Sequence, residues 1–234
     1  MSESLARMPV TITPSDLPTP RHGDAPYTIS MVCTGNICRS AMAEIVLIDR
    51  LTAAGVPTWG RTGVVVTSAG VSDEERGNPI DRRARRLLAE RDYGTGGDAA
   101  ARAVTAAIAG HAAHRIGDAE LAGADLVLAM TSAHRRELLR RAERLGVDAD
   151  RIRMFRELDP AAGAERHWAG ADARYELDVP DPWYGTMEDF VATLEVVERV
   201  SDALAPALVE LAAERSQTLT RAQAPGRAAR PASR

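Results

Sequence analysis

The residues best suited to do chemistry in this chain are a thiol and a guanidinium six positions apart, Cys33 and Arg39. The β-branched run at 27–32 predicts a strand before them, and the apolar pattern at 41–48 predicts a helix after them. Amide N–H groups between a strand and a helix can surround a tetrahedral anion, and the helix dipole adds positive potential. The pattern therefore predicts an anion site with a thiol at its floor, which suits transfer of a phosphoryl group to sulfur.

The loop between the two residues is expected to bind the phosphate, and its members are Thr34, Gly35, Asn36, Ile37 and Cys38. Gly35 lets the backbone approach closely, and Asn36 tolerates the left-handed conformation that such a loop needs. A Cys-x5-Arg spacing is weak on its own, because arginine is frequent in this chain. The alternative is a buried structural cysteine beside a surface arginine.

A second signal lies far downstream, at Asp181-Pro182-Trp183-Tyr184-Gly185. Alone, this segment would be interpreted as an aromatic turn. Together with the loop it supplies a carboxylic acid, Asp181, that can protonate a leaving oxygen. Trp183 and Tyr184 are expected to wall a substrate cleft that holds a phenyl ring.

With these two segments, the chain resembles the low-molecular-weight protein tyrosine phosphatases, from about residue 27 to residue 211. That family has a C-x-G-N-x-C-R-S loop near the N-terminus and a D-P-aromatic-aromatic-G loop near the C-terminus. The resemblance implies that Cys33 is the nucleophile, that Arg39 clamps the phosphate and that Ser40 donates its hydroxyl to the sulfur. It implies that Asp181 is the general acid and then the general base, with a phosphocysteine intermediate.

The resemblance also implies three supporting residues. In the family, the loop asparagine is fixed by a serine that ends the second strand and by a histidine ahead of the third strand. Here these positions are taken by Asn36, Ser68 and His111. A lone serine or histidine is more often an ordinary hydrogen-bonded residue, and His114 is the competing choice for the histidine.

Both cysteines of the chain lie in this loop, so no structural disulfide framework is expected. Two thiols around a phosphate-sized cavity suggest a reversible Cys33–Cys38 disulfide that protects the nucleophile. The alternative, that Cys38 is a small residue fitting a tight loop, stays open.

Composition limits the other classes. The 234 residues carry a net charge of −4, which gives no global attraction to nucleic acid or membrane. The five histidines show no metal-ligand spacing, and no metal or cofactor is expected. With no signal peptide evident and two reactive-loop cysteines, a cytoplasmic location is expected, and secretion by a route without a signal peptide stays open. The expected partners are a phosphotyrosine protein or peptide and phosphate or another oxyanion.

Strands are predicted at 27–32, 64–68, 124–130 and 152–155, and helices at 41–48, 81–91, 134–145 and 186 to about 214. Gly146 is expected to end the third of these helices, and the arginine-rich face of the second is interpreted as solvated. The alternation predicts an α/β fold with a four-stranded parallel sheet flanked by helices on both faces, and the resemblance implies the flavodoxin-like arrangement of the low-molecular-weight phosphatases. The site should lie at the carboxyl ends of the strands. The expected organisation is a flexible leader at 1–26, a phosphatase domain at 27–214 and a disordered tail at 215–234. Segments 93–106 and 163–174 are interpreted as insertions.

The chain departs from the family at the rim of the cleft. Relatives usually have an aromatic residue after the second strand, whereas residues 71–77 here are non-aromatic and acidic. This rim is expected to weaken stacking on a phenyl ring and to disfavour acidic peptides, and Trp168 or Tyr175 is the expected replacement for the missing wall.

Three other hypotheses compete with the tyrosine phosphatase. A protein-arginine phosphatase of the same family is expected to have threonine where this chain has Ile37. An arsenate reductase of the same fold would need further cysteines to relay a disulfide, and both cysteines of this chain already lie in the loop. The last hypothesis is a catalytically impaired, oxyanion-binding regulatory module. Loss of activity normally shows first in the catalytic groups, and here these groups are all present, namely Cys33, Arg39, Ser40 and Asp181.

Overall fold

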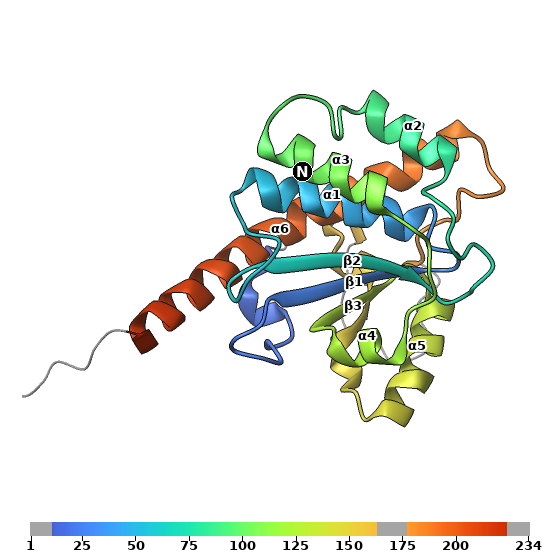
Figure 1. The fold of residues 1–234 in the computed structure, drawn as a ribbon. Helices are drawn as coiled ribbons and strands as arrows, with labels where there is room; N and C mark the ends of the chain where they lie inside the picture. The colour runs from blue at the N-terminus through green and yellow to red at the C-terminus, as the bar shows by residue number, and fades with distance from the viewer. Residues whose placement is uncertain (1–10, 163–176, 224–234) are drawn as a thin grey trace, which may run out of the picture.

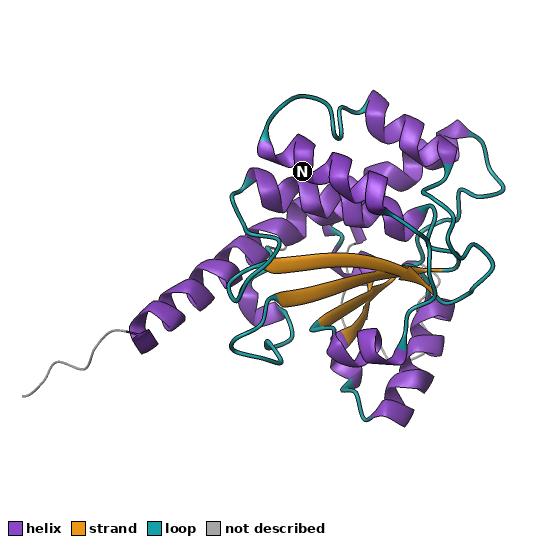
Figure 2. Ribbon diagram, in the orientation of Figure 1, coloured by secondary structure: helices purple, strands orange, loops and turns teal. Residues whose placement is uncertain are grey.

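The computed structural model describes residues 11–162 and 177–223 (Figure 1). Its centre is a sheet of four parallel strands in the order β2-β1-β3-β4 (Figure 2). The strands are β1 Tyr27–Cys33, β2 Val64–Gly70, β3 Leu126–Ala129 and β4 Ile152–Met154. The parallel strands require crossover connections, and helices supply them.

The helices cover both faces of the sheet, which confirms the predicted α/β fold (Figure 1). On one face α1 lies against the sheet, with α2, α3 and α6 around it, while α4 and α5 lie on the other face (Figure 1). The helices are α1 Arg39–Ala53, α2 Arg82–Glu90, α3 Ala99–Gly110, α4 Asp118–Gly123, α5 Ser132–Leu145 and α6 Met187–Gln223. Short 3-10 turns occur at Pro14–Asp16, Ala149–Arg151 and Phe155–Leu158.

The central strand β1 is apolar and almost fully buried, because helices cover both of its faces. Its last residue, Cys33, pairs with Gly70 at the end of β2. The carboxyl ends of β1 and β2 therefore meet at one edge of the sheet, where the loop at 34–38 leads into α1.

Two helices were not predicted from the sequence, α3 and α4. The segment at 93–106, interpreted as an insertion, contains most of α3, whose Val104 is fully buried in the core that α1 shares. That it is an insertion stays a prediction. The other segment so interpreted, 163–174, lies outside the described residues, as do Trp168 and Tyr175.

The N-terminal segment differs from the expected flexible leader, because residues 11–26 pack against the body of the protein. Ile12 and Leu17 are buried in the main core. The buried carboxylate of Asp125 accepts hydrogen bonds from the backbone N–H of Arg21 at 2.6 Å and of Thr28 at 2.8 Å. Sequence composition does not reveal these anchors, since they come from residues a hundred positions away.

At the other end, α6 continues to Gln223, beyond the predicted start of a tail at 215. The guanidinium of Arg215 donates through Nη2 to the carbonyl oxygens of Ala25 and of Arg61, the latter at 2.8 Å. This part of the helix therefore holds the segment before β1 in place. No helix in the described part of the chain combines the length and apolar character that crossing a bilayer requires.

Candidate active site

The thiol of Cys33 lies at the end of β1, and only 2% of the residue is exposed. Its Sγ is 3.0 Å from the Ser40 hydroxyl and accepts a hydrogen bond from the backbone N–H of Asn36 at 3.3 Å. Ser40 belongs to the first turn of α1, so the sulfur lies near the positive end of that helix. The sulfur therefore lies beside a hydroxyl and a backbone N–H group at the N-terminus of a helix.

Arg39 is the first residue of α1 and is buried. Its Nη1 donates to the carbonyl oxygen of Val179 at 3.2 Å, and its Nη2 donates to Asp181 Oδ2 at 2.5 Å and to Thr34 Oγ1 at 3.4 Å. Its Nε has no hydrogen-bond partner among the described residues. A guanidinium held in this way keeps one N–H group for an incoming anion and can give up a second one by releasing Asp181.

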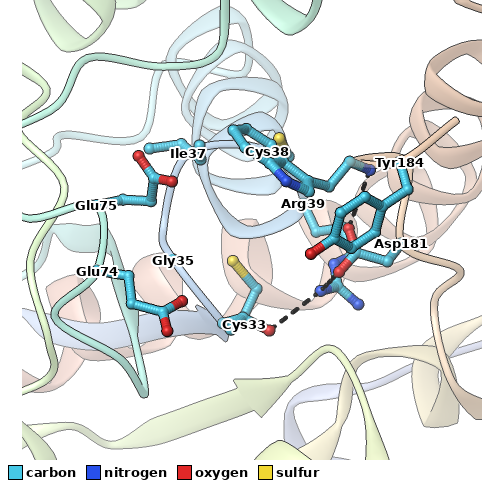
Figure 3. Close-up of a pocket in the computed structure, with 11 residues that line it drawn as sticks. Cys33, Gly35, Ile37, Cys38, Arg39, Glu74, Glu75, Asp181 and Tyr184 are labelled. Atoms are coloured by element: carbon cyan, nitrogen blue, oxygen red, sulfur yellow. Dashed lines mark hydrogen bonds and ion pairs between the residues drawn. The ribbon is translucent and has the colours of Figure 1, made fainter. Parts of the chain in front are cut away.

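Asp181 comes from a loop that precedes α6, 142 positions after Arg39 in the chain. Its side chain is 43% exposed, and Oδ1 accepts a hydrogen bond from the backbone N–H of Trp183 at 3.2 Å. The carboxylate therefore faces the same space as the Cys33 sulfur, on the opposite side from Glu74 and Glu75 (Figure 3).

Asn36 holds the loop in shape. Its φ of 62° is in the left-handed region, as the sequence predicted. Its side-chain amide donates to the hydroxyl oxygens of Ser68 at 2.8 Å and Ser40 at 3.1 Å, and its Oδ1 accepts from the backbone N–H of His114 at 3.2 Å. The imidazole of His111 donates through Nε2 to the Asn36 carbonyl at 2.8 Å. The structure thus brings Asn36, Ser68 and His111 together. The side chain of His111 contacts the loop, whereas His114 contacts it through its backbone N–H.

Two largely buried titratable side chains behind the loop, Glu44 and His134, were not predicted. Glu44 accepts a hydrogen bond from the Ser68 hydroxyl, and burial raises the pKa of its carboxyl to about 7. Its Oε2 is 3.9 Å from His111 Nδ1, and burial lowers the pKa of that imidazole. His134 lies 2.9 Å from Thr34 Oγ1 through Nε2, and burial lowers its pKa to about 3.

The sequence held a signal for only one of the two. Glu44 is a lone acidic residue in an apolar helical stretch, four positions after Ser40, and such a residue needs a buried partner. His134 stands in a run of arginines on a polar helix, where nothing marks it as buried.

Two glycines allow close backbone approaches at the site. A side chain at Gly70 would collide with the Thr34 carbonyl oxygen, so only glycine fits where β2 meets the loop. At Gly35 a Cβ would lie 2.8 Å from Cγ of Glu75, which is a flexible side chain. Gly35 therefore also leaves space for the Glu75 side chain on the rim of the pocket.

Ile37 and Cys38 are both buried and line the pocket. Cys38 caps the N-terminus of α1, and burial raises the pKa of its thiol. Both cysteines are free, and a disulfide between them stays a prediction.

The walls of the pocket are acidic on one side and aromatic on the other (Figure 3). The cavity has a volume of about 160 Å³, with Glu74 and Glu75 on the loop after β2, and Trp183 and Tyr184 beside Asp181. Tyr184 is 94% exposed, whereas Trp183 is 37% exposed. A flat ring entering the pocket would pass between these walls to reach the sulfur.

An arginine on α2 holds the loop that carries Asp181 and was also not predicted as part of the site. The guanidinium of Arg83 donates to the carbonyl oxygens of Trp183 at 3.1 Å and Gly185 at 3.4 Å. It lies 5.5 Å from the centroid of the Trp183 ring and 4.5 Å from that of Phe190, and it pairs with Asp81 at 3.2 Å.

Comparisons with known proteins identify the family of the chain. Residues 28–217 match a family model described as "Low molecular weight phosphotyrosine protein phosphatase". A "Low molecular weight protein-tyrosine-phosphatase" of Streptomyces coelicolor is 38% identical over 186 residues, which cover 79% of this chain and 94% of that protein.

Two solved structures show the same fold. The low molecular weight protein tyrosine phosphatase from T. tengcongensis is 29% identical with a TM-score of 0.56, and the match covers 76% of this chain and 97% of that one. A mutant of the YwlE arginine phosphatase, with a phosphorylated active-site serine, is 27% identical with a TM-score of 0.54, and the match covers 77% and 95% of the two chains.

Proposed function

The chain belongs to the low molecular weight phosphotyrosine protein phosphatase family, and on that premise we propose that it hydrolyses phosphotyrosine in proteins through a phosphocysteine intermediate. The observation that carries the proposal is the convergence of Cys33, Arg39 and Asp181 on one pocket. These three supply a nucleophile, an anion clamp and an acid, which are the groups that the reaction needs.

In the first step the phosphate enters the loop and competes with Asp181 for Nη2 of Arg39, while Nε supplies a second donor. The Asp181 carboxylate, released from Arg39, takes up a proton from solvent. The Cys33 thiolate then attacks phosphorus, the bond from phosphorus to the tyrosine oxygen breaks, and Asp181 gives its proton to that oxygen. Loop N–H groups and the guanidinium stabilise the charge on the equatorial phosphate oxygens.

In the second step a water molecule attacks the phosphocysteine and gives a proton to Asp181. The sulfur–phosphorus bond breaks, inorganic phosphate leaves and the thiolate is regenerated. The Ser40 hydroxyl, 3.0 Å from Sγ, stabilises the departing thiolate by hydrogen bonding. No step in this scheme requires a metal or a cofactor.

Phosphoarginine is the second candidate substrate, because a YwlE arginine phosphatase shares the fold. Ile37 argues against it, since this side chain lines the pocket and has no hydroxyl with which to orient attack on a phosphoramidate. The acidic wall formed by Glu74 and Glu75 would attract a guanidinium group, which is the observation in its favour.

The test compares hydrolysis of matched phosphotyrosine, phosphoserine and phosphoarginine peptides by the wild type and by Cys33→Ser. We expect phosphate release from the phosphotyrosine peptide, and we expect the variant to bind phosphate without turnover. A preference for phosphoarginine would reject the argument from Ile37. Phosphate binding without turnover in the wild type would favour a catalytically impaired regulatory module.

We also propose that the protein works in a reducing compartment, the cytoplasm. The support is chemical: a thiolate nucleophile is lost on oxidation, and both cysteines of the chain lie at the pocket.

A further inference from the structure

A second hollow in the protein surface is lined mainly by arginines and lies apart from the catalytic cysteine. It has a volume of about 410 Å³ and lies between the loop after β2, the segment that leads into α4, and helix α5. Its charged lining residues are Arg76, Arg115, Arg141, Arg144, Asp73 and Asp118. We call it the arginine hollow.

Arg141 distinguishes the arginine hollow from a cluster of exposed surface side chains, because its guanidinium is fixed within the fold. It is only 5% exposed, and its Nη2 donates to the Ile116 carbonyl at 2.8 Å and to Asp118 at 2.6 Å. Its Nη1 has no hydrogen-bond partner among the described residues. A buried donor without an acceptor costs free energy, and a small shift of the guanidinium toward an anion in the hollow would supply the missing acceptor.

The charge of the lining selects a dianion. Four arginines and two aspartates give 4 − 2 = +2, in a chain whose net charge is −4. The aspartates leave part of the positive charge unpaired: Asp73 is 3.7 Å from Arg76, and Asp118 pairs with Arg141. A phosphate monoester carries nearly two negative charges and several acceptor oxygens, and guanidinium groups bind it in a bidentate way.

The arginine hollow and the catalytic pocket share one loop. Residues 71–77 follow β2, with Glu74 and Glu75 on the catalytic pocket and Asp73 and Arg76 on the hollow. The loop is fixed at its base, because Val71 N–H donates to the Cys33 carbonyl at 2.9 Å. The two sites therefore adjoin the same loop, which a peptide bound in the pocket would cross on its way to the hollow.

We propose that the arginine hollow binds a second phosphorylated residue of the phosphoprotein substrate, an inference that rests on the proposed function. The acidic rim repels negative charge close to the phosphotyrosine, and the hollow attracts it farther along the peptide. Recognition is then bipartite, with a neutral or basic segment between two phosphorylated residues.

The test uses synthetic peptides with one phosphotyrosine and a phosphonate analogue of phosphoserine placed two to ten residues away on either side. For at least one spacing, the wild-type kcat/KM should exceed that of the singly phosphorylated peptide by about five- to tenfold, the scale of one or two exposed ion pairs. The advantage should shrink as ionic strength rises. Equal kcat/KM values at every spacing would overturn the proposal.

The variants are chosen to remove charge without disturbing the fold. Arg115→Gln/Arg144→Gln changes two exposed side chains of the hollow and should abolish the advantage, with kcat/KM for the singly phosphorylated peptide unchanged. The matched control, Arg136→Gln/Arg140→Gln, removes the same charge from exposed positions on α5 that do not line the hollow, and it should keep the advantage. If the advantage survives in the Arg115/Arg144 variant, or is lost in both double variants, the hollow does not recognise the second phosphorylated residue.

A binding measurement separates this proposal from the proposed function. Cys33→Ser protein is titrated with the same peptides, and tighter binding of the doubly modified peptide, lost in the Arg115/Arg144 background, supports the hollow even if the wild type hydrolyses nothing. Absence of turnover would then count against the phosphatase function alone.

Discussion

Asp181 is the acid of the proposed mechanism, and it is also the residue that occupies Arg39 in this structure at 2.5 Å. The two roles are compatible if the substrate phosphate displaces the carboxyl from the guanidinium. A side chain that is 43% exposed on one face of the pocket has the room for that movement.

Replacing Asp181 with asparagine should lower kcat for a phosphotyrosine peptide by about 10²–10⁴-fold, since that is the usual contribution of a positioned acid. The loss should be smaller for 4-nitrophenyl phosphate, whose phenolate leaves without much help from a proton. Steady-state assays with both substrates check this expectation. Equal losses for the two substrates would mean that Asp181 mainly holds Arg39. The control is Glu188→Gln, which removes an exposed carboxylate after the same loop.

We expect Ser68 to act on the reaction through Asn36, since its hydroxyl accepts from the Asn36 amide at 2.8 Å and donates to Glu44. Ser68→Ala should lower kcat by about tenfold, because the loop N–H groups are then less well aimed at the phosphate. The phosphate-binding constant should change less than kcat. Thr67→Val, at the preceding position of β2, is the control. A parallel loss of melting temperature and activity in Ser68→Ala would indicate a purely structural role.

At this scale the sequence predicted the backbone conformation of the loop, because that motif is local. The loop from Cys33 to Ser40 is contiguous, and Asn36 adopts the predicted left-handed backbone. Ser68 and His111 could be placed only through the resemblance to a family. Arg83 was missed, because its contacts with the loop at 182–185 exist only in three dimensions.

At the scale of elements, helix α2 positions the acid loop through Arg83. This one side chain joins two carbonyls of the loop, the Trp183 ring and Asp81 at the start of its own helix. A cation that touches an aromatic face and two carbonyls limits the conformations of the loop. The sequence predicted the helix from its arginine-rich polar face but interpreted that face as solvated.

Arg83→Gln should lower kcat/KM for a phosphotyrosine peptide by about three- to tenfold, because the acid loop then samples positions from which Asp181 cannot reach the leaving oxygen. The loss should vanish in an Asp181→Asn background, since the two residues act on the same step. Arg86→Gln, on the same helix and paired only with exposed Glu90, is the control and should be neutral. If the losses from Arg83→Gln and Asp181→Asn add in the double variant, Arg83 does not act by positioning Asp181.

Element boundaries show where local patterns are insufficient. The C-terminus of α5 was predicted correctly, because Gly146 supplies the left-handed cap at φ 66°. The end of α6 was not, since its last turns contain no apolar stripe and are held by contacts of Arg215 with the segments before β1 and before β2. Long-range contacts of this kind have no local signature.

At the scale of the whole molecule, the site rests on a largely buried polar cluster behind the loop. Its members are Glu44 on α1, Ser68 on β2 and His111 on the segment before α4, and Glu44 contacts both of the others. Such a cluster couples the shape of the phosphate loop to the stability of the fold.

The pKa of Glu44, raised to about 7 from an ordinary 4.5, makes folding stability depend on pH. Between these values the folded protein holds a proton that the unfolded chain releases, so the free energy of unfolding falls as pH rises from about 4.5 to 7. His134 acts in the opposite direction: its pKa of about 3 in the folded state, against an ordinary 6.5, makes stability rise with pH between those values. The two dependences overlap, so the wild-type curve alone does not isolate Glu44.

Glu44→Gln isolates it, because glutamine mimics the protonated carboxyl and can still accept from the Ser68 hydroxyl. We expect the variant to match the wild type near pH 4.5 and to be more stable at pH 8 by about 3 kcal/mol, which is the free energy that a pKa change from 4.5 to about 7 represents. Urea unfolding at several pH values measures the difference, with exposed Glu143→Gln as the control. A difference that does not change with pH would mean that the Glu44 carboxyl is already ionised in the folded protein at pH 4.5 to 7. The buried cluster would then act through fixed hydrogen bonds rather than through a proton.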